Sequence, residues 1–204
     1  ARVAKALCAK DLRRIEPGSH RMREELEGGA ERVDLDLEFV EDPHFLCTHE
    51  EFGKWASGRK ELVMEYFYRG QRKKLDILVD EAGNPEGGDW NFDKQNRRAF
   101  KQAPEPPELP EYSIDDTTQQ VMDDIAAALP DLPGSIEGCN WPVTRRQAFS
   151  ALHAFVRDRL PDFGDYQDAM LTGRRFLYHS VLSHYINCGL LDPLDVCVRA
   201  AKAY

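Results

Sequence analysis

The sequence predicts a mostly α-helical protein with a small α/β part at its N-terminal end. Three observations lead to this fold class. Residues 33–40 alternate apolar and polar side chains, the period of a strand with one buried face. Residues 80–112 hold clusters of glycine, proline and acidic residues, which is typical of a loop or linker. From residue 113 onward, apolar side chains recur at helical spacing behind capping signals.

Residues 1–48 are expected to form helix or loop, strand, helix and strand, in that order. A weak strand is predicted at Arg13–Glu16. Ser19 stands where it can cap a helix that runs to about Glu27, and Gly28 with Gly29 is expected to end it. This part is too small to stand alone, so we expect its sheet to have further strands and both chain ends to be cuts in a longer protein.

Residues 49–112 are expected to contain helices and then a long loop. Thr48 precedes an acidic turn, and Arg59–Leu78 has helical spacing with basic residues near its end. Basic side chains complement the dipole at the end of a helix, but a contact with a DNA backbone is also open. The spacer Pro104–Pro110 is rich in proline and glutamate, and it is expected to be stiff and extended.

Residues 113–204 are expected to be almost entirely helical. The residues at the predicted ends of these helices are of the types that usually begin and end helices. The predicted boundaries are capping boxes at Asp116 with Gln119 and at Thr144 with Gln147, short helices at 166–171 and 180–189, and a last helix opened by Asp192 and Pro193.

Composition narrows the classes of function. The formal net charge is −9, which argues against a general nucleic-acid-coating surface, although a local basic groove is compatible with it. No apolar run approaches the ~18 residues of a membrane span, and no signal peptide is present. We therefore expect a cytoplasmic, monomeric protein with no membrane partner. The five cysteines are widely spaced without a CxxC pair, so no self-contained zinc site is expected.

One segment suits a phosphate group. Tyr166 is followed, thirteen residues later, by His179 and Ser180, and then by Leu182 and Ser183. The pattern predicts the start of a helix here, where free backbone N–H groups and the positive end of the dipole favour an anion. Serine hydroxyls can also donate to phosphate oxygens. A serine-capped helix without a ligand is the alternative that these residues alone leave open.

Four further stretches have a characteristic order and spacing: Glu41–Cys47, Gly58–Arg69, Gly87–Arg97 and Phe163–Met170. Together with the segment at 179–183, they make the whole chain resemble the iron–sulfur branch of the photolyase/cryptochrome superfamily, which contains bacterial cryptochromes and (6-4) photolyases. The resemblance implies that 1–48 end an α/β antenna domain, that 49–112 are an interdomain linker, and that 113–204 are the first half of an all-helical FAD-binding domain.

The resemblance also implies cofactors and the residues that hold them. The cofactors are FAD, a ribityl-lumazine antenna chromophore and a [4Fe-4S] cluster. The residues that match the FAD site are Tyr166, His179, Ser180, Leu182 and Ser183, with His179 standing where the family usually has threonine. Cys197 matches the first cysteine of the cluster, and the other three are expected beyond Tyr204. No catalytic residue is assigned, because the family's repair histidines lie mostly further downstream.

The function that the resemblance implies is that of a DNA photolyase, a lyase in which light drives an electron from reduced FAD into damaged DNA. Repair of (6-4) photoproducts is the expected reaction. Two alternatives stay open: a cryptochrome-type blue-light photoreceptor without repair activity, and a cofactor-free helical fragment. The 204-residue chain by itself is expected to be inactive and to bind FAD weakly or not at all.

Overall fold

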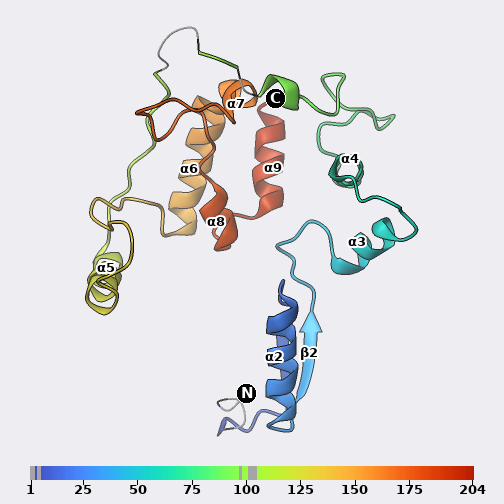
Figure 1. The fold of residues 1–204 in the computed structure, drawn as a ribbon, viewed down its shortest axis with the longest axis vertical. Helices are drawn as coiled ribbons and strands as arrows, with labels where there is room; N and C mark the ends of the chain where they lie inside the picture. Colours follow the sequence, from blue (N-terminus) through green and yellow to red (C-terminus); the bar gives the residue numbers. More distant parts are fainter. Residues whose placement is uncertain (1–2, 4–5, 97, 101–104) are drawn as a thin grey trace. The chain divides into compact units, whose positions relative to one another are not determined.

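The computed structural model describes residues 3, 6–96, 98–100 and 105–204, and these residues are mostly helical, as predicted (Figure 1). The elements are β1 (Asp11–Ile15), α2 (His20–Glu31), β2 (Asp36–Val40), α3 (His49–Ala56), α4 (Met64–Leu75), η1 (Asp93–Gln95), α5 (Asp116–Ala128), α6 (Arg145–Asp158), α7 (Leu160–Tyr166), α8 (Ser183–Asn187) and α9 (Pro193–Lys202). The chain divides into two compact units, residues 1–62 and 63–204. The assignment of 1–48, 49–112 and 113–204 to three family domains stays a prediction.

The first unit contains a strand–helix–strand motif. Strands β1 and β2 pair in parallel, with Asp11 opposite Asp36 and Ile15 opposite Val40. A parallel pair needs a crossover connection, and α2 supplies it. Among the described residues the sheet has these two strands. The predicted order of strand, helix and strand is therefore confirmed in this unit.

Helix α2 continues past the two glycines that were expected to end it. Ser19 takes the N-cap position, although its side chain makes no capping hydrogen bond. The helix runs through Gly28 and Gly29 to Glu31, and Ala30, directly after the glycines, is 3% exposed. A glycine costs a helix about 1 kcal/mol relative to alanine. Burial of the Ala30 side chain favours continuation of the helix against that cost, which local propensity alone does not predict.

The second unit has its hydrophobic core around α6. Four residues of this helix are buried, and they pack with residues from the segment that contains α8. The core residues are Ala148, Ala151, Leu152, Phe155, Leu182, Tyr185 and Leu191. This confirms the apolar face that the sequence predicted behind Thr144. No helix in the described part of the chain has both the length and the apolar character needed to cross a bilayer.

Of the three helix starts in this unit that were predicted from capping residues, two are confirmed and one is displaced by a residue. Thr144 and Gln147 form a capping box at α6, and Asp192 caps α9 with Pro193 in its first turn. At α5 the cap is Asp115, not Asp116. Asp115 has the extended backbone of an N-cap residue, and its carboxylate accepts from both the amide and the hydroxyl of Thr118.

The predicted short helices at 166–171 and 180–189 were wrong in their bounds. The first is α7, which begins at Leu160 because Pro161, expected to end α6, instead occupies the first turn of the next helix. The second is α8, which starts only at Ser183. Val181 has a φ of 54°, in the left-handed region, so a helix cannot continue through it from residue 180.

The helix that was predicted over Arg59–Leu78 also begins later than predicted. Helix α4 starts at Met64 rather than Arg59, and it ends where Asp76 adopts the left-handed conformation. The region after it is loop, as predicted, apart from the short 3-10 helix η1 and an isolated bridge between Val79 and Pro85. Pro104, the first residue of the predicted spacer, lies outside the described residues.

Candidate cofactor site

Tyr166 lies at the end of α7, in a cluster of three aromatic rings. It stacks on Phe100 with ring centroids 4.6 Å apart and an interplanar angle of 14°. Its ring also lies 5.4 Å from that of Tyr178, the residue before His179. The structure thus brings Tyr166 beside the start of the 179–183 segment, as a shared site requires. Burial raises the pKa of Tyr178, so its phenol stays neutral near pH 7.

The end of α7 is attached to a linker segment about 70 residues earlier in the chain. Asn96 donates from Nδ2 to Asp168 Oδ2 over 3.0 Å, and its carbonyl accepts from the Asp168 amide. Arg98 pairs with Asp165 at 2.7 Å. Asn96 is 8% exposed, so this connection is partly shielded from water. Two stretches that carry the family resemblance therefore meet here, although Arg97, which ends the first stretch, lies outside the described residues.

The 179–183 segment turns back on itself instead of forming the start of a helix. His179 accepts the Leu177 amide on Nδ1 at 3.2 Å, so its ring caps a local turn. Val181 then takes its left-handed conformation, which directs Leu182 into the core, where it is 2% exposed. A contact between Leu182 and a cofactor would therefore come from its backbone.

Ser180 and Ser183 are left on the accessible side of this turn. Ser183 is exposed at the first position of α8, and Ser180 is half-buried. Helix α8 has five residues, so its dipole is small, and an anion here depends on side chains and local amides rather than on a macrodipole. The exposed Ser183 hydroxyl is accessible to an anion, and the phosphate role of this segment stays a prediction.

Arg159 is a site residue that the sequence reasoning missed. It joins α6 to α7, is only 2% exposed, and lines a small hollow together with Ser180, Tyr112 and Tyr185. Among the described residues, its Nε and Nη1 atoms have no hydrogen-bond partner. Burial lowers its pKa, but an arginine remains charged at neutral pH. No sequence signal separates this arginine from its exposed neighbour Arg157.

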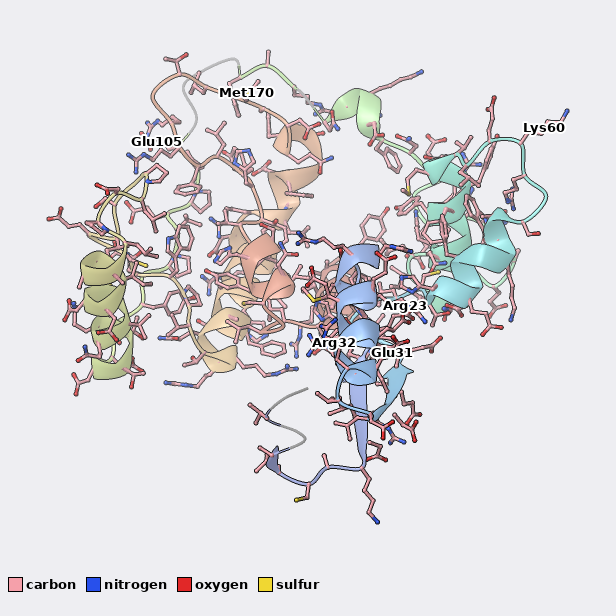
Figure 2. All side chains as sticks on the ribbon, turned by 60° about the horizontal axis from the view of Figure 1, so that its bottom comes forward. Arg23, Glu31, Arg32, Lys60, Glu105 and Met170 are labelled. Carbon is pink, nitrogen blue, oxygen red and sulfur yellow. The ribbon has the colours of Figure 1, made fainter. Side chains whose placement is uncertain are left out.

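The exposed chain between the two halves of the candidate site is a loop. Met170, labelled in Figure 2, is 92% exposed, and residues 171–176 are exposed as well. The helix predicted over 166–171 does not reach this loop, because α7 ends at Tyr166. The loop carries Phe176, whose ring meets that of Trp141 at 6.0 Å, and Trp141 in turn lies 5.2 Å from the His184 ring.

Cys197 is half-buried on α9. Burial raises the pKa of its thiol, and the Asp192 charge adds to that effect. No group of three potential metal ligands occurs among the described residues. The assignment of Cys197 to a cluster therefore stays a prediction.

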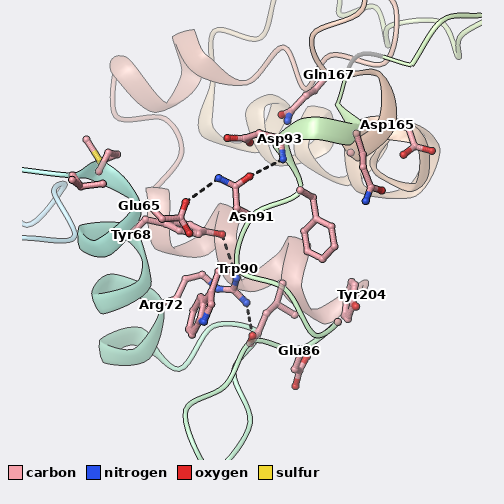
Figure 3. Close-up of a pocket in the computed structure, with 17 residues that line it drawn as sticks. Glu65, Tyr68, Arg72, Glu86, Trp90, Asn91, Asp93, Asp165, Gln167 and Tyr204 are labelled. Carbon is pink, nitrogen blue, oxygen red and sulfur yellow. Dashed lines mark hydrogen bonds between the residues drawn. The ribbon is translucent and has the colours of Figure 1, made fainter.

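A larger hollow of about 990 Å³ lies in the second unit, lined by residues of α4 and the loop after it together with Gly164, Asp165, Gln167 and Tyr204 (Figure 3). Trp90 is close to it, and three cationic side chains approach the Trp90 ring: Arg69 at 5.6 Å, Arg72 at 5.0 Å and Lys73 at 5.4 Å. Arg72 also donates to the carbonyls of Ile77 and Leu78, beyond the end of α4. For Arg72 these bonds agree with the first of the two uses considered from the sequence, which is to complement the helix end, and a contact with a DNA backbone stays untested.

Comparison with known proteins adds independent findings. Residues 1–141 match the family described as deoxyribodipyrimidine photo-lyase-related protein. A protein of Agrobacterium fabrum, named (6-4) photolyase, is 45% identical over 189 residues, which are 93% of this chain and 37% of that protein. An uncharacterized protein of Acanthamoeba polyphaga mimivirus is 27% identical over 102 residues, 48% of this chain and 52% of that protein. The chain therefore spans about a third to a half of the length of these relatives.

Proposed function

Because the chain belongs to the deoxyribodipyrimidine photo-lyase-related family, we propose that it is a section of a flavin-dependent, light-driven DNA photolyase. The observation that carries this proposal is the 45% identity to the (6-4) photolyase of Agrobacterium fabrum, which extends over 93% of the chain. Repair of (6-4) photoproducts is accordingly the proposed reaction of the whole protein.

The residues present fit one part of a flavin nucleotide. The aromatic cluster of Tyr166, Phe100 and Tyr178 offers a flat, apolar contact beside the turn that carries Ser180 and Ser183. In our proposal this chain holds the nucleotide part of FAD, with hydroxyls donating to phosphate oxygens and Tyr166 packing alongside. When bound, FAD supplies the light-excited electron that repairs damaged DNA, and the chain's own residues bind and orient it.

The finer parts of the proposal concern groups that need more protein than this chain contains. A [4Fe-4S] cluster takes four cysteine thiolates, of which Cys197 would supply one. We propose the ribityl-lumazine antenna for the α/β part and damaged DNA as the partner of the whole, monomeric protein. The 204-residue chain alone is proposed to be inactive, because it carries only some of the contacts that a flavin needs.

The proposal is tested on the full-length protein. We expect purified protein to contain stoichiometric flavin, and under blue light to repair an oligonucleotide with a single (6-4) photoproduct. A sample kept in the dark and an oligonucleotide with a cyclobutane dimer are the controls. Bound flavin without repair would favour the photoreceptor alternative, and protein purified without flavin that also fails to take up added FAD would remove the proposal.

A second measurement locates the flavin. Ser180→Ala is expected to lower the FAD content of the full-length protein, because it removes a hydroxyl at the turn. Ser150→Ala is the matched control, since Ser150 is exposed on α6 and is not part of the candidate site. Equal flavin content in both variants and the wild type would show that Ser180 takes no part in binding.

A further inference from the structure

We propose that Arg159 is a buried anchor for the diphosphate of the flavin nucleotide, acting from beneath the Ser180 turn. This inference rests on the proposed function and adds a residue that lies outside the 179–183 segment. Its starting point is Arg159's place in the fold. The side chain is 2% exposed, at the junction of α6 and α7, and it lines the same hollow as Ser180.

Among the described residues Arg159 has no direct ion-pair partner, although the nearby charge of Asp158 favours the charged guanidinium. Its Nε and Nη1 atoms are enclosed without a hydrogen-bond partner, and no ion pair to it is formed among the described residues. The neighbouring carboxylate, Asp158, is instead paired with Arg157 at 2.6 Å. Buried charges in proteins are normally paired and hydrogen-bonded, because an isolated one is costly to desolvate. A partner of opposite charge is therefore expected at this position.

The other polar groups of the hollow indicate what that partner is. The hydroxyl of Tyr112 is also enclosed without a hydrogen-bond partner among the described residues, and Ser180 contributes a second hydroxyl. Guanidinium and hydroxyl groups can all donate, whereas a phosphate can only accept. Donors from three separate segments therefore converge on one place. This arrangement matches an anion with several acceptor oxygens, and arginine forms particularly strong hydrogen bonds with phosphate.

The size of the hollow limits how the anion binds. Its volume is about 10 Å³, room for about one water molecule. A phosphate group does not fit inside. It would lie at the mouth, over Ser180, with one of its oxygens or a single bridging water occupying the hollow. Such an arrangement suits the diphosphate of a flavin nucleotide whose other parts contact Tyr166 and Tyr178.

The test uses the full-length protein after flavin removal, titrated with FAD and, separately, with riboflavin, which lacks the diphosphate. Arg159→Met is expected to weaken FAD binding by about tenfold or more and to leave riboflavin binding unchanged. The control is Arg146→Ala on the same helix, which is exposed and should change neither affinity. If the wild-type protein bound neither ligand, the proposed function itself would be contradicted. If wild type and Arg159→Met bound FAD with equal affinity, only the role of Arg159 would be contradicted.

Thermal unfolding of the flavin-free protein separates an anchor from a structural ion pair. If Arg159 awaits a ligand, Arg159→Met removes a buried charge that has no hydrogen-bonded partner in the described chain, so the melting temperature should stay the same or rise, while the stabilisation by FAD is lost. A lower melting temperature with unchanged FAD affinity would instead show that Arg159 pairs with another part of the protein. This result would overturn the inference.

Two milder variants keep the test decisive if Arg159→Met does not fold. Arg159→Lys keeps the charge but loses the planar fork of donors, so FAD should bind several-fold more weakly with riboflavin unaffected. Tyr112→Phe removes only the enclosed hydroxyl and should weaken FAD binding less. Unchanged FAD affinity in both variants would overturn the inference.

Discussion

Helices α5 and α6 begin with similar chemistry and differ in what their apolar faces contact. Each has an N-cap side chain that accepts an amide of its first turn, and their lengths are 13 and 14 residues. In α6, Leu152 is 0% and Phe155 4% exposed. In α5, Val121 is 50% and Ile125 39% exposed, and none of the residues of this helix is buried.

The difference separates local from non-local determinants of structure. A cap involves residues three positions apart, so its formation depends on the adjacent sequence alone. Burial depends on segments that arrive from elsewhere, here Leu182, Tyr185 and Leu191 against α6. Two helices with similar start signals can therefore differ greatly in how much stability their side chains contribute.

Truncation of an apolar side chain should show the largest difference between the two helices. Leu152→Ala is expected to destabilise the protein by about 2–5 kcal/mol, since it leaves a cavity in the core. Val121→Ala in α5 should change stability by no more than about 0.5 kcal/mol. Urea unfolding of the two variants measures both values. Similar losses would mean that α5 also buries its apolar face in solution.

The connection between the linker and the end of α7 should have an intermediate effect. Asn96→Ala removes the mostly buried side-chain amide that donates a hydrogen bond to Asp168. We expect the free energy of unfolding to fall by about 1–3 kcal/mol. A double-mutant cycle with Asp168→Ala should give a coupling of about 0.5–3 kcal/mol, because the two side chains are in direct contact. A coupling of zero would show that the linker does not help to position Tyr166.

Removal of a cap should have a smaller effect that does not depend on burial. Thr144→Ala at the start of α6 is expected to cost about 1 kcal/mol, and Thr144→Ser, which keeps the hydroxyl, much less. Amide hydrogen exchange in the first turn reports the local loss directly. If Thr144→Ala left exchange in that turn unchanged, the capping box would contribute nothing to α6.

The pH should affect the start of α5 and not that of α6, and this is the smallest effect expected. Hydrogen bonds from the hydroxyl and amide of Thr118 lower the pKa of Asp115, whereas the Thr144 cap does not titrate. A lowered pKa means that the stabilisation is present at neutral pH and is lost as the pH falls through the folded-state pKa, below the usual range for aspartate.

Amide exchange in α5 between pH 5 and 2 measures this effect. Asp115→Asn, which can cap without ionising, should abolish the pH dependence while the first turn stays formed. Retention of the same pH dependence in Asp115→Asn would show that another carboxylate causes it.

Helix starts set by local residues, such as those of α6 and α9, were predicted correctly from the sequence, and boundaries set by distant contacts were not. Thr144 and Asp192 were placed correctly because each acts on amides within its own turn. The start of α8 was wrong because Val181 adopts a left-handed conformation that a valine rarely takes by itself. The continuation of α2 through Gly28 and Gly29 was likewise missed, because the burial of Ala30 that favours it depends on the tertiary structure.

The same distinction between local and distant determinants applies to the candidate site. The proximity of Tyr166 to the 179–183 segment was expected from the family resemblance, and the Tyr166–Tyr178 contact agrees with it. Which residues touch a flavin stays a prediction. The contact of Phe100 with Tyr166 and the enclosure of Arg159 had no sequence signal, because both arise where distant segments meet.

By itself, the sequence determined the helical character of the chain, its strand–helix–strand start, most of its caps and its family, all of which depend on short patterns and their order. Only the tertiary structure decided which apolar faces are covered, where α8 begins, and that Arg159, next to an exposed ion pair, is enclosed with two donor atoms that have no hydrogen-bond partner among the residues described. Burial and the pairing of charges depend on atoms brought together from remote segments, and no local pattern encodes those neighbours.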